Sequence, residues 1–285
     1  MPESSHTRPS GLSPELVEKY DRLRAIMGTL QGCVVGFSGG VDSTLLLAVA
    51  VEVLGKQVLA VTATSETYPE RELAEARDLA AALGARHRVI VSEELDLPEF
   101  RHNPRNRCYY CKKELFGKLI AIAVEEGLPF VLDGTNIDDL GDHRPGRQAA
   151  AEIGVRSPLE EAGLTKDDIR ALSQALGLPT WDKPAFACLS SRFPYGTAIT
   201  RERVRQVGLA EESLFKLGFR TLRVRYHGNV ARLELGPGEF IQATTTLRDQ
   251  VLQGVKAAGF TYVAVDLQGY RTGAMNEANS PETME

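Results

Sequence analysis

The stretch from Gly36 to Ser43 carries residue types that can hold a chain of phosphates. It reads Gly-Phe-Ser-Gly-Gly-Val-Asp-Ser, after an apolar run that predicts a buried strand and before one that predicts a helix. The adjacent Gly39 and Gly40 let backbone amides approach an anion closely, because no Cβ stands in the way. A helix N-terminus behind them adds unpaired N–H groups and a positive dipole end. The segment therefore predicts an anion site at a strand-to-helix turn.

Side chains in the same turn indicate which anion is bound. Ser38 and Ser43 can donate hydroxyl hydrogen bonds, and Asp42 can hold Mg²⁺ or cap the turn. The P-loop of kinases and GTPases requires a lysine here, and this turn has none. The turn resembles the PP-loop of ATP pyrophosphatases, which holds the β,γ-pyrophosphate of ATP as leaving group while a substrate oxygen attacks the α-phosphate. The alternative is a polar turn without a ligand. We expect ATP to be bound by Ser38, Gly39, Gly40, Val41, Asp42 and Ser43.

A second polar cluster, Asp-Gly-Thr-Asn-Ile-Asp-Asp at 133–139, follows a predicted strand. Gly134 allows a tight exit from the strand, and the Thr135 hydroxyl, the Asn136 amide and carboxylates such as that of Asp138 can face the nucleotide or its Mg²⁺. Loops after strands also contain such residues for turn chemistry alone, but the nearby PP-loop favours a site. Arg144, a few residues later, can supply a cation to a phosphate.

Residues 177–197 form a long predicted loop that contains a Trp, a Lys, a Cys and an Arg. Such loops inside compact domains are usually functional. Lys183 and Arg192 can neutralise pyrophosphate or substrate anions, and Arg192 is the better bidentate ligand. Cys188, with Ser191 and Arg192 close behind it, is expected to be a thiolate held near cations.

Cys108 and Cys111 form a Cys-x-x-Cys pair, whose spacing fits one edge of a metal or cluster site. A four-cysteine zinc site cannot form with one such pair in one chain. With Cys188 as third thiolate, the ligand set leaves one position open, as in catalytic metal sites and in Fe–S clusters with a non-protein ligand. Cys33, in the first predicted strand, is expected to serve packing only.

Strand and helix signals alternate through the first two-thirds of the chain, which predicts an α/β fold with a doubly wound parallel sheet. We expect strands at 33–37, 57–62, 86–91 and 130–133, and helices at 14–30, 43–54, 70–83, 111–126 and 165–176. Ligands of such sheets bind beyond the carboxyl ends of the strands, where the polar loops and Thr62 fall. A smaller α+β module is expected to follow, with helices at 200–217 and 237–258 and strands at 220–226, 230–235 and 261–267.

The expected organisation is a PP-loop domain at 13–197 and the module at 198–271, between disordered ends at 1–12 and 272–285. The net charge of −5 and pI of about 5.7 lack the basic footprint of nucleic-acid-binding proteins. No membrane segment or signal peptide is evident, so a cytoplasmic location is expected. In that compartment the four cysteines indicate metal, sulfur or redox chemistry rather than disulfides.

Together these features resemble the LarE family, the ATP-dependent sulfur transferases of nickel-pincer nucleotide biosynthesis. The resemblance covers nearly all of residues 20–271. It rests on the PP-loop and on four further segments, at 133–136, 142–146, 157–170 and 178–200. The block Trp-Asp-Lys-Pro-Ala…Ala-Cys-Leu…Ser-Arg within the last segment is specific, whereas the PP-loop alone marks only the superfamily.

The resemblance implies a substrate and a reaction. The substrate would be pyridinium-3,5-biscarboxylic acid mononucleotide, whose carboxylate is adenylylated by ATP with Mg²⁺ and then receives sulfur at the acyl carbon. Two rounds would give the bisthiocarboxylic mononucleotide that later chelates nickel for lactate racemase and related enzymes. The sulfur would come from sulfide or another donor, and family members form trimer-based hexamers.

The resemblance also bears on the cysteines. Cys188 matches the family cysteine that, in single-cysteine members, gives up its own sulfur and becomes dehydroalanine. This chain departs from that pattern by having Cys108 and Cys111. It resembles the three-cysteine branch, in which the cysteines are thought to hold a [4Fe–4S] cluster that carries an extra sulfide. Three thiolates with one open iron suit sulfide binding, so we prefer the cluster to the sacrificial mechanism.

The predicted module contains a candidate site for the substrate phosphate. Arg223, Arg225 and His227 alternate along one predicted strand and so share a face. A solvated strand face would show the same pattern, and the LarE resemblance, which implies an arginine pair there, favours the phosphate site. Three glutamates are candidates for a subunit junction or a metal site, namely Glu211, Glu212 and Glu234.

Three other functions compete with sulfur transfer. An ammonia-using amide ligase of the NAD synthetase type would share the PP-loop and the chain length but would not need three cysteines. A tRNA thiolase would share the sulfur chemistry, but it usually carries an RNA-binding or zinc module and a more basic surface. A nucleotide sensor is disfavoured because the PP-loop motif is intact.

Overall fold

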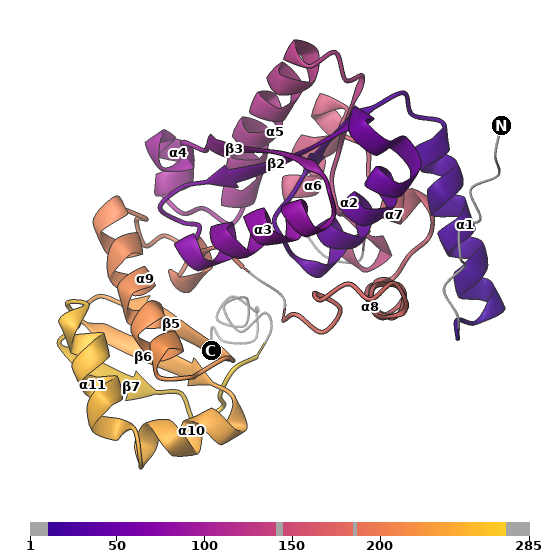
Figure 1. Cartoon of the computed structure of the whole chain (residues 1–285). Coiled ribbons are helices and arrows are strands. Elements are labelled where there is room, and N and C mark those ends of the chain that lie inside the picture. Colours follow the sequence, from indigo (N-terminus) through magenta and orange to yellow (C-terminus); the bar gives the residue numbers. More distant parts are fainter. Residues whose placement is uncertain (1–10, 141–144, 185–186, 272–285) are drawn as a thin grey trace, which may run out of the picture. The chain divides into compact units, whose positions relative to one another are not determined.

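The structure is a computed structural model that describes residues 11–140, 145–184 and 187–271 (Figure 1). The chain divides into two units. Unit 1 comprises Met1–Ser65, Glu70–Glu93 and Asn106–Phe186, and unit 2 comprises Glu66–Pro69, Glu94–Arg105 and Ala187–Glu285. The predicted domain boundary at 197 falls within unit 2. Residues 1–10 and 272–285, where we expected disorder, lie outside the described residues.

A four-stranded parallel sheet forms the centre of unit 1, in the order β3-β2-β1-β4. Its strands are β1 (Cys33–Gly36), β2 (Val58–Thr64), β3 (Arg86–Val91) and β4 (Phe130–Leu132). Their positions confirm the four predicted strands and the predicted parallel α/β fold. Because β1 lies between β2 and β4, the PP-loop leaves the sheet from a central strand.

Helices cover both faces of this sheet, because alternate side chains of a strand point to opposite sides. Cys33 and Val35 face one core cluster, whereas Val34 faces the other. The first cluster is shared with α1 (Pro14–Gly28), α2 (Val41–Leu54), α3 (Glu70–Ala82), α7 (Pro158–Glu161) and α8 (Lys166–Ala175), and the second with α5 (Arg107–Glu125) and α6 (Pro145–Ile153). Cys33 is fully buried, and burial raises the pKa of its thiol to about 12, which fits the predicted packing role.

Unit 2 contains a three-stranded sheet in the order β5-β6-β7. A hairpin joins β5 (Leu222–His227) to the antiparallel β6 (Val230–Leu235), and β7 (Tyr262–Val265) pairs with β6 in parallel. Gly228 in the hairpin turn has a φ of +64°, which favours glycine. The helices of this unit are α4 (Pro98–Arg101), α9 (Arg201–Lys216), α10 (Pro237–Thr244) and α11 (Arg248–Ala257). Short 3₁₀ turns lie in both units, at Gly55–Gln57 and Ile137–Leu140 in unit 1 and at Glu94–Asp96 and Leu189–Arg192 in unit 2.

Several elements differ from the prediction. Helix α5 begins at Arg107 rather than at 111, so Cys108 and Cys111 both lie within its first five residues. The single helix expected at 237–258 is two helices, α10 and α11, separated where Thr245 leaves helical geometry at φ −123° and ψ −92°. Three consecutive β-branched threonines at this point disfavour a continuous helix. Helices α4, α6 and α7 were not predicted.

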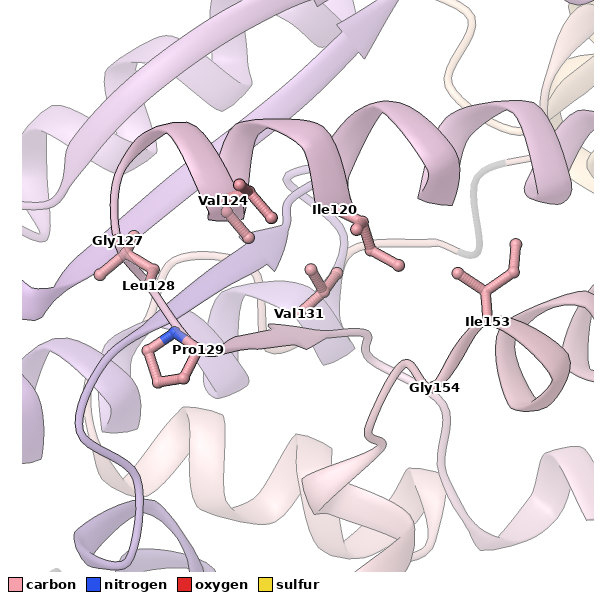
Figure 2. A pocket seen from close by; sticks show the side chains of 9 residues that line it. Ile120, Val124, Gly127, Leu128, Pro129, Val131, Ile153 and Gly154 are labelled. Atoms are coloured by element: carbon pink, nitrogen blue, oxygen red, sulfur yellow. The ribbon is translucent and has the colours of Figure 1, made fainter.

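An apolar hollow of about 380 Å³ lies in unit 1, away from the PP-loop. It is lined by Leu128 and Pro129, which precede β4, and by apolar side chains of α5, β4 and α6. Figure 2 shows Ile120, Val131 and Ile153 around this space. The hollow therefore opens at the amino end of β4, whereas parallel sheets bind ligands at the carboxyl ends. Among the described helices, none has the length and apolar character to cross a bilayer.

His87 of β3 couples the fold of unit 1 to pH. Its Nε2 lies 2.9 Å from Thr62 Oγ1, which donates to Phe37 O, so the imidazole N–H donates to the threonine. Burial, and the charge of Arg77, lower the pKa of His87 below its usual 6.5. The unfolded chain therefore binds this proton more readily, and the free energy of unfolding should fall as pH drops below 6.5. His87→Gln keeps an N–H donor and should reduce this fall.

The measurement is urea unfolding at a pH well above and a pH well below 6.5, followed by the fluorescence of Trp181, the single tryptophan. His102→Gln, at an exposed position, is the control. An identical pH dependence in wild type and His87→Gln would contradict the assignment.

Candidate functional site

The PP-loop has the strand–turn–helix form that the sequence predicts. It leaves β1 at Gly36 and enters α2 at Val41, with Gly40 in the N-cap position. Two serine hydroxyls brace it from within: Ser38 Oγ lies 3.2 Å from Ser43 Oγ, and Ser43 Oγ donates to Gly40 O at 3.2 Å. The loop amides are therefore held in one arrangement before any ligand binds.

Two glycines permit close approaches around this loop. Gly39 has a φ of +67°, and a Cβ there would lie 3.3 Å from Ala76 of α3. A Cβ at Gly134 would lie 3.1 Å from Ser43 N and 3.2 Å from Asp42 Cβ. The exit of β4 therefore packs directly on the first turn of α2. This contact brings the two predicted polar clusters, 36–43 and 133–139, together.

Asp42 is held by two donors, Asn136 of the second polar cluster and Lys166, which the sequence analysis did not assign to the site. Its Oδ2 lies 2.5 Å from Lys166 Nζ, and its Oδ1 accepts a 3.3 Å hydrogen bond from Asn136 Nδ2. Lys166 is the first residue of α8. A positive charge in the first turn of a helix is unfavourable, because it opposes the helix dipole. A lysine at the predicted start of a helix was therefore the signal in the sequence that could have identified Lys166.

The other predicted residues of the second cluster mainly shape their own loop. Asp133 accepts hydrogen bonds from Thr135 Oγ1 at 2.8 Å and from Ser157 Oγ at 2.7 Å. Asp138 Oδ2 accepts from the backbone N–H of Lys166 at 2.7 Å. These contacts fix the loop against α8, and Arg144 lies outside the described residues. Thr62 is buried, and its hydroxyl donates to Phe37 O at the start of the PP-loop and accepts from His87, so its side chain ties the loop to β3.

Lys183 reaches the PP-loop, near which the sequence analysis expected it to act. Its Nζ lies 3.3 Å from Gly39 O, 2.6 Å from Glu75 Oε2 and 2.9 Å from Glu72 Oε2. Burial disfavours the charged amine, but the hydrogen bonds that it donates to Glu75 and Glu72 outweigh this effect and raise the pKa of Lys183. The ammonium therefore stays charged, and two carboxylates of α3 balance it.

In unit 2, Arg192 has a different environment from the one we predicted. Its side chain is 1% exposed, and it pairs with Glu211 through Nε at 2.8 Å and Nη2 at 3.0 Å. Its Nη1 donates to Ala187 O at 2.7 Å and to Cys188 O at 3.2 Å. The guanidinium, expected to neutralise an anion, thus holds the backbone of the Cys188 turn. Ser191 joins the same group, since its Oγ lies 2.7 Å from Arg192 Nη1.

Arg223 and Arg225 lie on the same face of β5, as the alternation predicted. Arg225 is 5% exposed and pairs with the fully buried Glu234 at 2.7 Å, and it donates to Ser191 O at 2.8 Å. Arg223 lies over the Tyr270 ring, and burial together with Arg192 lowers its pKa.

The candidate glutamates of unit 2 also have partners in the structure. Glu211 and Glu234 pair with buried arginines, and Arg192 keeps the pKa of Glu211 low against the effect of burial. Glu212 lies 3.6 Å from Lys216, one helical turn away on α9.

The cysteines of the predicted cluster form no disulfide; Cys108 and Cys111 belong to unit 1, and Cys188 belongs to unit 2. Cys108 is exposed and Cys111 half-buried, and their spacing of three residues puts both on one face of α5. Cys188 is half-buried and begins the 3₁₀ turn of Leu189–Arg192. Within the described part of the chain, no three His, Cys, Asp or Glu side chains gather as a metal site.

Comparison with known proteins identifies the family. The NAD synthase family model matches residues 21–97, the part that contains the PP-loop. An uncharacterised protein of Synechocystis is 45% identical over 92% of this chain and 98% of its own length. Pyridinium-3,5-bisthiocarboxylic acid mononucleotide synthase of Lactiplantibacillus plantarum is 43% identical over 92% of this chain and 95% of its own length. The chain belongs to this synthase family. An NH₃-dependent NAD⁺ synthetase of Pyrobaculum aerophilum is also 43% identical, but over 26% of this chain.

The likeness to the synthase thus extends over 92% of this chain, whereas the likeness to the NAD synthetase is confined to 26% of it. The LarE resemblance expected from the motifs is confirmed at the level of the family.

Gly134→Ala should damage the contact between β4 and α2. Its Cβ would meet the backbone of Ser43, which cannot move without distorting the PP-loop. We expect a loss of stability of about 1–3 kcal/mol and weaker binding of ATP. Gly117→Ala is the control, because that glycine lies in α5 and a Cβ there meets nothing within 4 Å. Calorimetric titration of ATP measures the effect, and unchanged affinity in Gly134→Ala would contradict the assigned packing.

Arg192→Met should destabilise unit 2 and loosen the Cys188 turn. It leaves the Glu211 carboxylate buried without its guanidinium, a change that costs about 3–5 kcal/mol. Arg201→Met is the control, since it removes ion pairs of a side chain that is 53% exposed. Such pairs contribute at most about 1 kcal/mol. Urea unfolding followed by circular dichroism gives the stability, and peptide mass analysis gives the alkylation rate of Cys188. An alkylation rate equal to that of wild type would contradict the positioning role.

Proposed function

We propose that this chain is an ATP-dependent sulfur transferase that converts pyridinium-3,5-biscarboxylic acid mononucleotide into its bisthiocarboxylic form, for nickel-pincer cofactor synthesis. The observation that carries the proposal is the combination of full-length likeness to the Lactiplantibacillus plantarum synthase with an intact PP-loop and Cys188. The likeness to NAD synthetase covers 26% of the chain, which disfavours the amide ligase. The acidic pI of about 5.7 disfavours a tRNA thiolase.

The first half-reaction activates a carboxylate, which is a poor electrophile on its own. A carboxylate oxygen of the substrate attacks the α-phosphorus of ATP, the bond to the β-phosphate oxygen breaks, and pyrophosphate leaves. The amides of the braced PP-loop and the N-terminus of α2 stabilise the charge on the leaving group. Asp42 fits a Mg²⁺ ion, because Mg²⁺ usually takes one or two protein carboxylates together with substrate phosphates. When bound, the ion would neutralise phosphate charge.

The arginine cluster of unit 2 suits the phosphate group of the substrate mononucleotide. The cluster contains four arginines and three carboxylates, so its net charge is +1. Its members are Arg192, Arg223, Arg225 and Arg232 with Glu211, Glu234 and Asp266. Arg223, on the same strand face as Arg225, is the member that we assign to the phosphate. We assign Arg225 a supporting role, because it pairs with the buried Glu234. Substitution of Arg225 would leave Glu234 buried without that partner, so the effects on folding and on substrate binding could not be separated.

The second half-reaction places sulfur on the acyl carbon. A sulfur nucleophile attacks the acyl-adenylate, the carbon–oxygen bond breaks, and AMP leaves with the oxygen. We assign sulfur delivery to Cys108, Cys111 and Cys188. Cys108 and Cys111 fit two corners of a [4Fe–4S] cluster, because they share the face of one helical turn and are not fully buried. Such a cluster, when bound, would supply an iron position for external sulfide. The sacrificial use of Cys188 is the alternative. We expect a cytoplasmic location, because the cysteines form no disulfide. We expect a trimer-based hexamer, because the LarE family forms one.

Turnover of the full chain with ATP and the biscarboxylic mononucleotide should release AMP and pyrophosphate. Chromatography of the nucleotides together with mass analysis of the thiocarboxylate product measures this. Release of ADP and phosphate would overturn the assignment.

The same assay separates the two routes of sulfur delivery. With protein purified without oxygen and supplied with sulfide, each of Cys108→Ala, Cys111→Ala and Cys188→Ala should abolish repeated turnover and reduce bound iron, because the three thiolates act on one cluster. Cys33→Ala, in the core, is the control. If Cys188→Ala alone is inactive, and spent wild-type protein has lost H₂S with dehydroalanine at position 188, the sacrificial route holds.

A further inference from the structure

A buried asparagine joins two segments of unit 2 that lie far apart in the sequence. Asn103 is fully buried, and its Nδ2 donates to three backbone oxygens. These belong to Pro194 at 2.8 Å, Thr197 at 3.1 Å and Phe193 at 3.3 Å. The backbone oxygen of Asn103 in turn accepts from Gly196 N at 3.0 Å. Three carbonyls also settle the orientation of the amide, because its own oxygen would repel them.

The backbone at Asn103 is held in an unusual conformation. Its φ is +54°, and no other residue of the described ranges except glycines has a positive φ. Pro104 follows, and a residue before a proline is normally extended. Such a conformation costs free energy and persists only where the surroundings impose it. The chain is already anchored just before this point, because Phe100 is buried and Arg101 O accepts from Ile199 N at 2.9 Å. Asn103 therefore fixes the course of the chain beyond that anchor.

The chain beyond Asn103 leads to the first two cysteines. It leaves unit 2 at Arg105, and Cys108 is the third residue after that point. Cys108 lies five residues after Asn103, and Cys188 lies five residues before Phe193. Five residues span at most about 18 Å when fully extended. The hydrogen bonds of Asn103 and these two short connections together limit how far Cys108 and Cys188 can separate.

The loop that Asn103 contacts has other attachments to unit 2. The ring of Phe193 is buried and lies 5.2 Å from that of Tyr226, between centroids. Thr197 N donates to Pro194 O at 2.9 Å, which closes the turn from within. The loop is therefore packed and closed by its own contacts. What the amide of Asn103 adds is the link to the segment that precedes Cys108.

We propose that Asn103 is a positioning residue for sulfur delivery, which fastens the segment leading to Cys108 and Cys111 to the segment that carries Cys188. In this role Asn103 touches neither substrate nor sulfur. It limits the separation of thiols that must serve one acyl carbon, and holding reacting groups in place lowers the entropic part of a barrier. The proposal rests on the assignment of sulfur delivery to these three cysteines in the proposed function.

Thiol cross-linking of the full chain, prepared without a cluster, tests the link apart from catalysis. With a short bifunctional maleimide, peptide mass analysis should find Cys188 joined to Cys108 or Cys111 in wild type. Asn103→Gly accepts a positive φ but has no amide. Its yield of this product should fall at least about fivefold, the effect of losing even one hydrogen bond. Asn103→Asp keeps the shape but turns an oxygen toward the three carbonyls, so its yield should be lower still.

The two half-reactions give a second measurement. In Asn103→Gly, exchange of pyrophosphate into ATP with the biscarboxylic mononucleotide should keep the wild-type rate at saturating substrate. Formation of the thiocarboxylate should fall at least about tenfold, because a misplaced reacting group slows the chemical step. General damage to the fold would lower both rates.

Asn106→Gly is the matched control, because it makes the same substitution closer to Cys108. The Asn106 side chain is exposed and makes no capping hydrogen bond to α5. Its cross-linking yield and both rates should equal those of wild type. Absence of the Cys188 product in wild type, a wild-type yield in Asn103→Gly, or an equal loss of both half-reactions would overturn the proposal. Failure of the wild type to form AMP and pyrophosphate would instead overturn the proposed function.

Discussion

The carboxylate of Asp42 lies at the N-terminus of α2, in the place where an anion is to be bound. A negative side chain there is stabilised by the helix dipole, but it repels phosphates unless a cation accompanies it. Lys166 supplies the positive charge and Asn136 a hydrogen bond, and each comes from a different segment that must be packed against α2. The absence of a side chain at Gly134 brings the loop after β4 close enough for Asn136 to reach Asp42. The geometry of unit 1 around the PP-loop follows from meeting this requirement.

A comparable constraint organises unit 2. Glu211 and Glu234 are buried carboxylates, which are costly to remove from water unless they are paired and hydrogen-bonded. Arg192 and Arg225 pair with them, and the same two guanidiniums donate to the backbone of Cys188 and Ser191. The turn that carries Cys188 is thereby fixed by buried charges rather than by apolar packing alone. A sulfur atom that must meet an acyl carbon benefits from such positioning.

The central strands were predictable because each is a short apolar run with turn signals on both sides, as in 33–37. Helix α6 was not predicted because it begins with Pro145-Gly146, a dipeptide that usually marks a turn. Here the proline occupies the first position of the helix, where no intrahelical hydrogen bond needs its N–H. The start of α5 was placed too late, because the Arg-Cys-Tyr-Tyr of its first turn shows no apolar periodicity. Local patterns thus located the core and failed where a helix end depends on packing.

By itself, the sequence determined the kind of chemistry. The glycines and serines of 36–43 specify an anion-binding turn, and the alternating apolar runs specify a parallel sheet that carries it. Only the tertiary structure decided which charges meet. Lys166 is 124 residues from Asp42, and Arg192 was expected to bind a ligand but pairs with Glu211, 19 residues away. Periodicity reports which face of an element is buried, not which charged side chain from another element comes to lie against it. The partners follow from the register of the strands and the packing of the helices, which the chain acquires on folding.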